Sequence, residues 1–157
     1  MDFNIEKLEV RQLTQNDLAQ FRALIEMFNM VFEEEGSTSS TETSLQRLLS
    51  SVNFIAIAAI LENQVVGGLT AYYLPKVYSA NSEVFLYDMA VRPECQRRGI
   101  GKRLFQQLKE YCIKHGVPVF FVLAHEEDQH AVEFYHSTGG KSEKVVNFIF
   151  EAEEPGK

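Results

Sequence analysis

A short segment rich in glycine and basic residues has the composition of an anion-binding turn. Gly99 and Gly101 lack a Cβ atom, so backbone N–H groups there can approach a ligand closely. Apolar residues at helical spacing, from Ile100 to Tyr111, predict that a helix begins at this point and adds the positive end of its dipole. Four cations surround it: Arg97, Arg98, Lys102 and Arg103. The pattern predicts a diphosphate site; the alternative is a solvated basic helix start after an ordinary left-handed turn.

A carboxylate interrupts the apolar segment that precedes this turn. Residues 84–91 are rich in aliphatic and aromatic side chains and predict a strand, which ends before Pro93 because proline lacks a backbone donor. An isolated buried carboxylate is costly, so Asp88 requires a fixed hydrogen-bond partner or a substrate ammonium group. Strand alternation places Glu83 and Tyr87 on one face and Asp88 on the other, unless a bulge changes the parity.

The remaining elements predict a single α/β domain over residues 1–157, with a mixed central sheet and helices on both faces. Gly67-Gly68 inside one strand indicates a bulge or a close backbone approach. The run 117–123 is continuously apolar, which predicts a strand buried on both faces and parallel to its neighbour. Further strands are predicted near 8–13, 53–61, 65–73 and 145–150, and helices at 18–32, 44–50, 100–114 and 131–137.

Composition excludes several classes of protein. The chain has 157 residues, a net charge of −7 and a pI near 5.1, which argues against nucleic acid or an anionic membrane as a partner and suits a cationic ligand. The two cysteines form neither a disulfide framework nor a metal spacing, and the histidines lack ligand spacing, so no metal is expected. The N-terminus lacks the pattern of a signal peptide, and a cytoplasmic location is expected.

The glycine-rich turn resembles a known family motif. Residues 96–101, Gln-Arg-Arg-Gly-Ile-Gly, fit the pattern Q/R-x-x-G-x-G/A of the acyl-CoA pyrophosphate loop of GNAT acetyltransferases, and they follow a hydrophobic strand as in that family. They fit neither a P-loop nor a dinucleotide-binding fingerprint. The resemblance implies the GNAT fold, acetyl-CoA as co-substrate and a homodimer paired through C-terminal strands. It implies acetyl-CoA contacts at Met89, Ala90, Val91, Gln96, Arg97, Arg98, Gly99, Ile100, Gly101 and Lys102.

The same resemblance implies roles in N-acetyl transfer, which requires a base for the amine and an acid for the departing thiolate. The backbone of residues 89–91 would hold the pantetheine arm. Tyr135 would be the acid, with a packed core tyrosine as the alternative. Asp88 and Glu83 are the candidate bases, and Asp88 is preferred. An acyl-enzyme on Cys95 or Cys112 is not expected, so the amine would attack directly.

A narrower resemblance is to the type I aminoglycoside 3-N-acetyltransferases. It rests on residues 53–59 with 71–76, on 82–91, and on 131–135. It implies acetylation of the 3-amino group of 2-deoxystreptamine in gentamicin-like antibiotics, with carboxylates around a polycation. The implied acidic residues are Asp88, Glu126, Glu127, Asp128, Glu34 and Glu35. Residues 128–132 depart from the family's Asp-Asp-Pro-Ala-Val by reading Asp-Gln-His-Ala-Val.

Two alternatives remain at the level of sequence. One is a GNAT enzyme that acetylates another small amine or a peptide. The other is a module that binds acyl-CoA without catalysis. The acidic run at 33–35 is likewise open, since charge runs usually form solvated faces.

Overall fold

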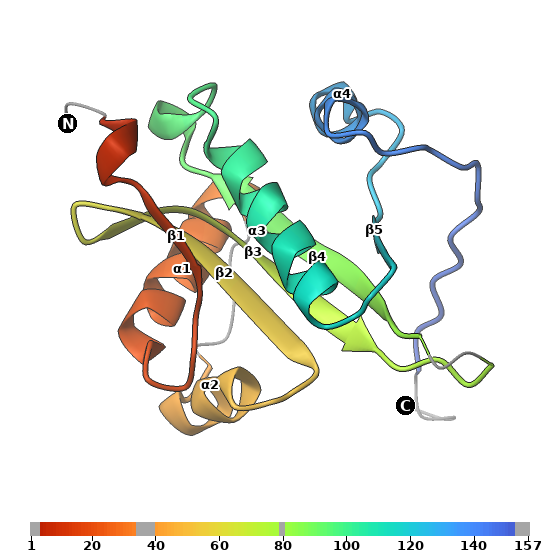
Figure 1. The fold of residues 1–157 in the computed structure, drawn as a ribbon, viewed down its shortest axis with the longest axis horizontal. Helices are drawn as coiled ribbons and strands as arrows, with labels where there is room; N and C mark the ends of the chain where they lie inside the picture. The colour runs from red at the N-terminus through yellow and green to blue at the C-terminus, as the bar shows by residue number, and fades with distance from the viewer. Residues whose placement is uncertain (1–3, 34–39, 79–80, 153–157) are drawn as a thin grey trace. The chain divides into compact units, whose positions relative to one another are not determined.

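The computed structural model describes residues 4–33, 40–78 and 81–152. It divides into two compact units, residues 1–123 and 124–157. Among the described residues, the first contains a sheet with three α-helices, and the second contains one α-helix, α4 (Gln129–Ser137) (Figure 1).

A five-stranded sheet forms the centre of the first unit. Its order follows the chain, and its members are β1 (Glu9–Gln12), β2 (Phe54–Leu61), β3 (Gln64–Leu74), β4 (Glu83–Val91) and β5 (Val119–Val122). Neighbours from β1 to β4 are antiparallel, and β5 pairs in parallel with β4. The predicted mixed sheet is confirmed, as is the parallel pairing of the strand after the glycine-rich turn.

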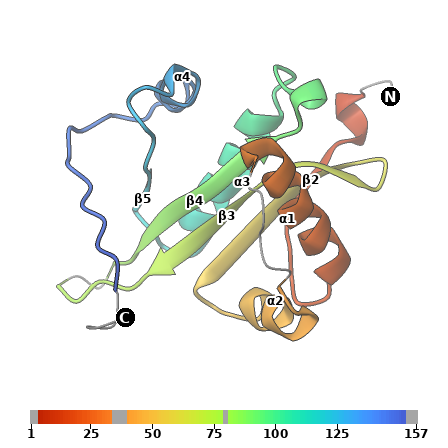
Figure 2. The ribbon, with the colours of Figure 1, turned by 180° about the vertical axis from the view of Figure 1, so that it is seen from behind.

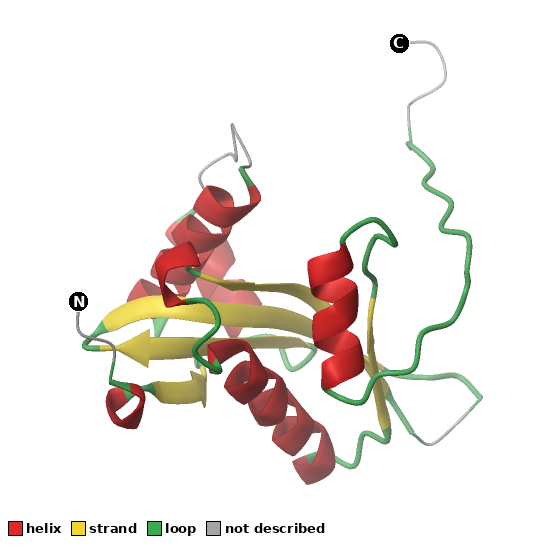
Figure 3. Ribbon diagram, turned by 90° about the horizontal axis from the view of Figure 1, so that it is seen from above, coloured by secondary structure: helices red, strands yellow, loops and turns green. Residues whose placement is uncertain are grey.

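Helices cover both faces of this sheet, as predicted. α3 (Ile100–Lys114) lies on the face seen in Figure 1, and α1 (Leu18–Phe32) and α2 (Glu42–Leu49) lie on the face seen in Figure 2. Figure 3 shows the helices on opposite sides of the strands. The two glycines of β3 permit this sandwich. A Cβ at Gly67 would lie 3.2 Å from Ile100 of α3, and one at Gly68 would strike Leu24 of α1 and lie 2.7 Å from the Ile57 carbonyl oxygen. The predicted close backbone approach is confirmed.

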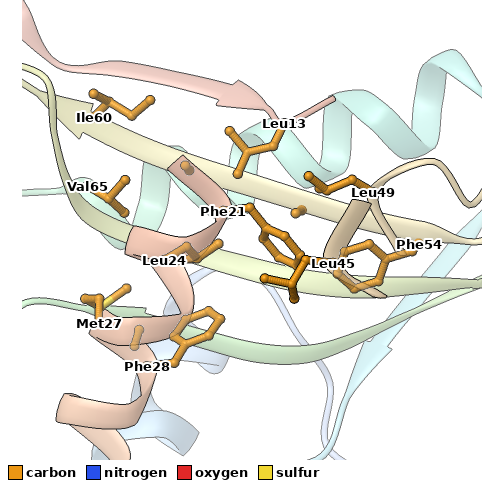
Figure 4. Packing of buried hydrophobic residues seen from close by; sticks show 13 residues of the cluster. Leu13, Phe21, Leu24, Met27, Phe28, Leu45, Leu49, Phe54, Ile60 and Val65 are labelled. Atoms are coloured by element: carbon orange, nitrogen blue, oxygen red, sulfur yellow. The ribbon is translucent and has the colours of Figure 1, made fainter. Parts of the chain in front are cut away.

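The core between α1, α2 and the sheet is built from the predicted apolar stripe of α1. Phe21 and Leu24 point from α1 toward the strands, and the Phe21 ring lies 5.7 Å from the ring of Phe54 on β2 (Figure 4). Burial of such side chains is the main favourable term in folding, at roughly 1.5–3 kcal/mol each. This packing fixes β3 and β4, which carry the candidate site, against a rigid support.

Asp17 ties the start of α1 to β1. Its carboxylate accepts hydrogen bonds from Arg11 Nη2 at 2.9 Å and from the Thr14 backbone N–H at 2.8 Å. The hydrogen bond from Arg11 is the chief reason why the pKa of Asp17 is lowered to about 2.

Two predictions about the C-terminal third are wrong. β5 is not buried on both faces, because it lies at the end of the sheet; Phe120 packs against Phe105 of α3, whereas Val119 and Phe121 on the other face remain 50% and 37% exposed. Residues 145–150 form no strand, although their composition favours one. A strand requires a partner for its backbone groups, and within the described residues 124–152 no strand is present to supply one.

Candidate active site

A β-bulge in β4 determines which side chains share a face with Asp88. Asp88 pairs with Thr70 of β3 and Leu86 pairs with Ala71, so Tyr87 is an extra residue without a partner position on β3. Phe85 pairs with Tyr72, which lies two residues from Thr70 on the same strand and therefore on the same face. The bulge thus brings Asp88 onto the α1 side of the sheet together with Phe85 and Glu83. At the level of sequence, a bulge could move Asp88 to the same face as Glu83, and the structure contains this bulge.

Asp88 has the fixed hydrogen-bond partner that its position requires. Thr70 Oγ1, in a side chain that is 8% exposed, donates to Asp88 Oδ2 at 3.3 Å. Asp88 itself is half-buried. Burial, followed by the charges of Tyr87 and Asp88, raises the pKa of Tyr72, which keeps this neighbouring phenol protonated at neutral pH. The carboxylate therefore lies at a partly enclosed point of the sheet.

Glu83, the other candidate base, is already paired. Its Oε1 lies 2.9 Å from Nζ of Lys76, an ion pair at the far end of β4 from the glycine-rich turn. This carboxylate therefore already has a cationic partner within the protein. The geometry therefore supports the preference for Asp88.

The glycine-rich turn has the local geometry of an open backbone cradle. Gln96 Nε2 donates to the Val91 carbonyl oxygen at 3.0 Å and so connects the turn to the end of β4. Arg97 and Gly99 have positive φ angles of 60° and 82°, and Gly99 is the N-cap residue immediately before α3. Beyond its chain neighbours, no atom of the described residues lies within 4 Å of a Cβ built at Gly99. The residues present fit a diphosphate, since the first turn of α3 leaves N–H groups unpaired.

The cations of this turn differ in their surroundings. Arg97, Arg98 and Lys102 are exposed, whereas Nη1 of Arg103 donates to the Ile5 carbonyl oxygen at 3.3 Å. Ile100, 1% exposed, anchors the helix start in the core. Arg103 thus has a structural role, and the other three charges define the basic rim of the turn.

The second unit carries the predicted acid and the acidic loop. Tyr135 lies on α4, and burial, followed by the charge of Asp128, raises the pKa of its phenol. Asp128 caps α4 by accepting a hydrogen bond from the Ala131 backbone N–H at 3.1 Å, which gives this acid a structural role of its own. Glu126 and Glu127 lie in the exposed turn before it. Glu34 and Glu35 lie outside the described residues.

Two parts of the site were missed at the level of sequence. Thr70, the partner of Asp88, cannot be identified before the register of β3 and β4 is known; the only signal was a hydroxyl residue in an apolar strand. The aromatic side chains that flank Asp88, Tyr72 and Phe85 among them, were assigned to a strand without a role. These rings share a face with Asp88 only because of the bulge, and no residue type in the sequence predicts a bulge at that position.

The cysteines are unsuited to nucleophilic chemistry. Both are buried, and burial raises the pKa of Cys112 to about 11, so its thiol stays protonated at neutral pH. Within the described ranges, no three His, Cys, Asp or Glu side chains are grouped so that they could hold a metal ion. None of the described helices has the length and apolarity needed to cross a bilayer.

Comparison with known proteins agrees with this arrangement. A family model described as the acetyltransferase (GNAT) family matches residues 21–139. The chain is 37% identical to the aminoglycoside acetyltransferase meta-AAC0020 from an uncultured soil metagenomic sample, solved in complex with sisomicin; the TM-score is 0.91, over 94% of this chain and 98% of that chain. The trehalose complex of meta-AAC0020 gives a TM-score of 0.92 at 37% identity, over 95% and 99% of the two chains.

A second soil metagenomic aminoglycoside acetyltransferase, HMB0005, is 36% identical, with a TM-score of 0.89 over 93% of this chain and 99% of that chain. No curated protein matches the chain significantly.

Proposed function

The chain belongs to the GNAT acetyltransferase family, and we propose that its acceptor is an aminoglycoside, acetylated at the 3-amino group of the 2-deoxystreptamine ring. The observation that carries the proposal is the similarity, at 37% identity over 94% of the chain, to an aminoglycoside acetyltransferase solved with sisomicin. The 3-position is supported by the sequence resemblance of residues 53–59, 71–76, 82–91 and 131–135 to the type I aminoglycoside 3-N-acetyltransferases.

Acetyl-CoA, the co-substrate of the family, supplies the acetyl group as a thioester. The turn at 96–101 and the start of α3 would hold its diphosphate through backbone N–H groups, with Arg97, Arg98 and Lys102 supplying positive charge. The backbone N–H groups of residues 89–91, beside the bulge of β4, would hold the pantetheine arm and polarise the carbonyl group.

Asp88 would accept the proton that the attacking amine loses. Its carboxylate is half-buried and oriented by Thr70, which is the arrangement expected of a positioned base. Tyr135 would donate a proton to the departing thiolate; burial raises the pKa of this phenol and keeps the proton in place at neutral pH. No acyl-enzyme is required, in agreement with the buried cysteines.

Acidic residues would bind the other ammonium groups of the acceptor. We assign this role to Glu126, Glu127 and Asp128, and to Glu34 and Glu35, while Asp88 would contact the reacting amine. The excess of acids over bases in the chain supports a polycationic acceptor.

Three further parts of the proposal concern the whole protein. We propose that residues 1–157 work as one catalytic domain, since the family match runs across both compact units. We propose a homodimer, supported by the exposed apolar segment 145–150. We propose a cytoplasmic location and a role in antibiotic resistance, both consistent with the use of acetyl-CoA and an aminoglycoside.

A thiol-release assay tests the proposed acceptor. Purified protein with acetyl-CoA is given sisomicin, gentamicin, spermidine or a basic peptide, and free CoA is measured against a control without amine. We expect release with the two aminoglycosides well above the control. If CoA is released with spermidine or the peptide but not with the aminoglycosides, the acceptor is another amine. If acetyl-CoA binds but no CoA is released under any condition, the non-catalytic alternative is supported.

A further inference from the structure

Four aromatic side chains form a continuous strip on the α1 face of the sheet, beside Asp88. We name Tyr72, Phe85, Tyr87 and Phe121 the aromatic strip. Ring centroids are 5.6 Å apart for Tyr72–Tyr87, 5.4 Å for Phe85–Tyr87 and 4.9 Å for Phe85–Phe121, and the last pair is stacked at 5°. The strip crosses from β3 over β4 to β5 within the first unit.

The strip is rigid at one end and open at the other. Tyr72 contacts Phe54 edge-on at 5.4 Å, and Phe54 contacts Phe21 in the core of α1. Toward β5 the rings become accessible: Tyr87 is 60% exposed and Phe121 is 37% exposed. Large aromatic side chains in mutual contact are normally covered, so a partly exposed group of them indicates a binding surface.

Charge identifies the chemistry of the ligand. Asp88 follows Tyr87 in the bulge and shares its face with Phe85, and its Oδ2 is held by Thr70. Glu83, on the same face at the other end of the strip, is paired with Lys76. The Asp88 carboxylate therefore shares its face of the sheet with the row of rings. Ring faces attract cations and the apolar C–H faces of sugars, and the carboxylate attracts an ammonium group.

We propose that the aromatic strip is the platform on which a cationic amino-sugar ring of the acceptor stacks while its ammonium group contacts Asp88. This inference rests on the proposed function. It deepens that function by naming the side chains that would recognise the sugar ring of the acceptor in addition to its ammonium group. Tyr87 contributes most, because the bulge projects it beside Asp88 and because it is the most exposed of the four.

Affinity measurements on Tyr87 variants test the platform. The dissociation constants of sisomicin and of acetyl-CoA are measured by calorimetry for the wild type, Tyr87→Ala and Tyr87→Phe, with Tyr78→Ala as the control because Tyr78 is fully exposed on the loop after β3. Tyr87→Ala is expected to raise the sisomicin constant about five- to thirty-fold, the range of a lost ring–cation contact. Tyr87→Phe keeps the ring and should stay within about twofold of the wild type, as should Tyr78→Ala and every acetyl-CoA constant.

The outcomes separate the two proposals. If the wild type acetylates sisomicin and Tyr87→Ala binds it as tightly as the wild type, the platform is wrong and the proposed function stands. If Tyr87→Ala changes the particle mass or the melting temperature but not sisomicin affinity, the strip is a protein contact surface and the platform is again wrong. If the wild type neither binds nor acetylates any aminoglycoside, the proposed function fails and the platform with it.

Discussion

One extra residue in β4 sets the chemistry around Asp88. Without the Tyr87 bulge, Asp88 would lie on the α3 side of the sheet, opposite to Phe85. With the bulge, the Asp88 carboxylate, its partner Thr70 and the aromatic strip lie on the same side. Bulges are common beside active sites because they re-aim a side chain and free backbone groups. The position of the proposed base is thus specified by backbone geometry as much as by residue type.

Replacing Asp88 by asparagine removes the proton acceptor while keeping the size of the side chain. We expect Asp88→Asn to lower kcat for an aminoglycoside about 100- to 10,000-fold, the usual range for a general base, with acetyl-CoA affinity unchanged. Glu83→Gln is the matched control, since Glu83 is paired with Lys76, and should lower kcat less than about threefold. A larger loss for Glu83→Gln than for Asp88→Asn would reverse the assignment of the base.

Tyr135 is expected to act through its hydroxyl group and not through its ring. Tyr135→Phe keeps the ring and should lower kcat about 10- to 100-fold. Since burial raises the pKa of the phenol above its ordinary value of about 10, the proton is retained throughout the neutral range, and the wild-type kcat should show no fall caused by this group below about pH 10. Wild-type kcat in Tyr135→Phe across a pH series would assign Tyr135 a packing role only.

Among the elements, the turn between β4 and α3 both starts a helix and presents basic side chains at the surface. Positive φ at Arg97 and Gly99 directs the chain into the first turn of α3, and Ile100 fixes that turn in the core. The basic side chains remain at the surface, where salt would screen their proposed contribution to diphosphate binding.

Arg98→Ala tests the diphosphate site. We expect the acetyl-CoA dissociation constant to rise about five- to tenfold at low salt and by less at high salt, because an exposed charge is lost. Lys109→Ala, at an exposed cation in the second half of α3, is the matched control and should change this constant by less than about twofold. An unchanged constant in Arg98→Ala would place the diphosphate elsewhere.

Local sequence patterns predicted most of the helices and strands, but they predicted less well which of them are buried and which strands pair. The helical stripe gave α1 its observed bounds, Leu18–Phe32, and the two-residue turn Glu62-Asn63, both residues with positive φ, joins β2 to β3. Burial of β5 and pairing of residues 145–150 were wrong, because both depend on which strand lies alongside. The pairing of Thr70 with Asp88 could not be predicted either, because it depends on how β3 and β4 align.

In the whole molecule, the C-terminal segment 145–150 carries several exposed apolar side chains. Its valine, isoleucine and phenylalanine side chains are 70–87% exposed: Val145, Val146, Phe148, Ile149 and Phe150. Exposed segments of this composition mark interaction surfaces. The proposed homodimer would bury them by strand pairing between copies.

Light scattering on the purified chain tests the dimer. We expect a mass twice the 17.9 kDa of the chain. Phe148→Asp should shift the protein toward the monomer, whereas Val52→Asp, at an isolated exposed valine of the first unit, should not. A monomer at micromolar concentration for the unaltered chain would contradict the proposal.

The product of the reaction tests the central claim most directly. Sisomicin is incubated with the protein and acetyl-CoA, and the product is analysed by mass spectrometry and by two-dimensional NMR. We expect a single added acetyl group on the 3-amino nitrogen of 2-deoxystreptamine. A single acetyl group on another amine would retain the enzyme class and contradict the assigned position, and unmodified sisomicin beside intact acetyl-CoA would contradict the aminoglycoside assignment itself.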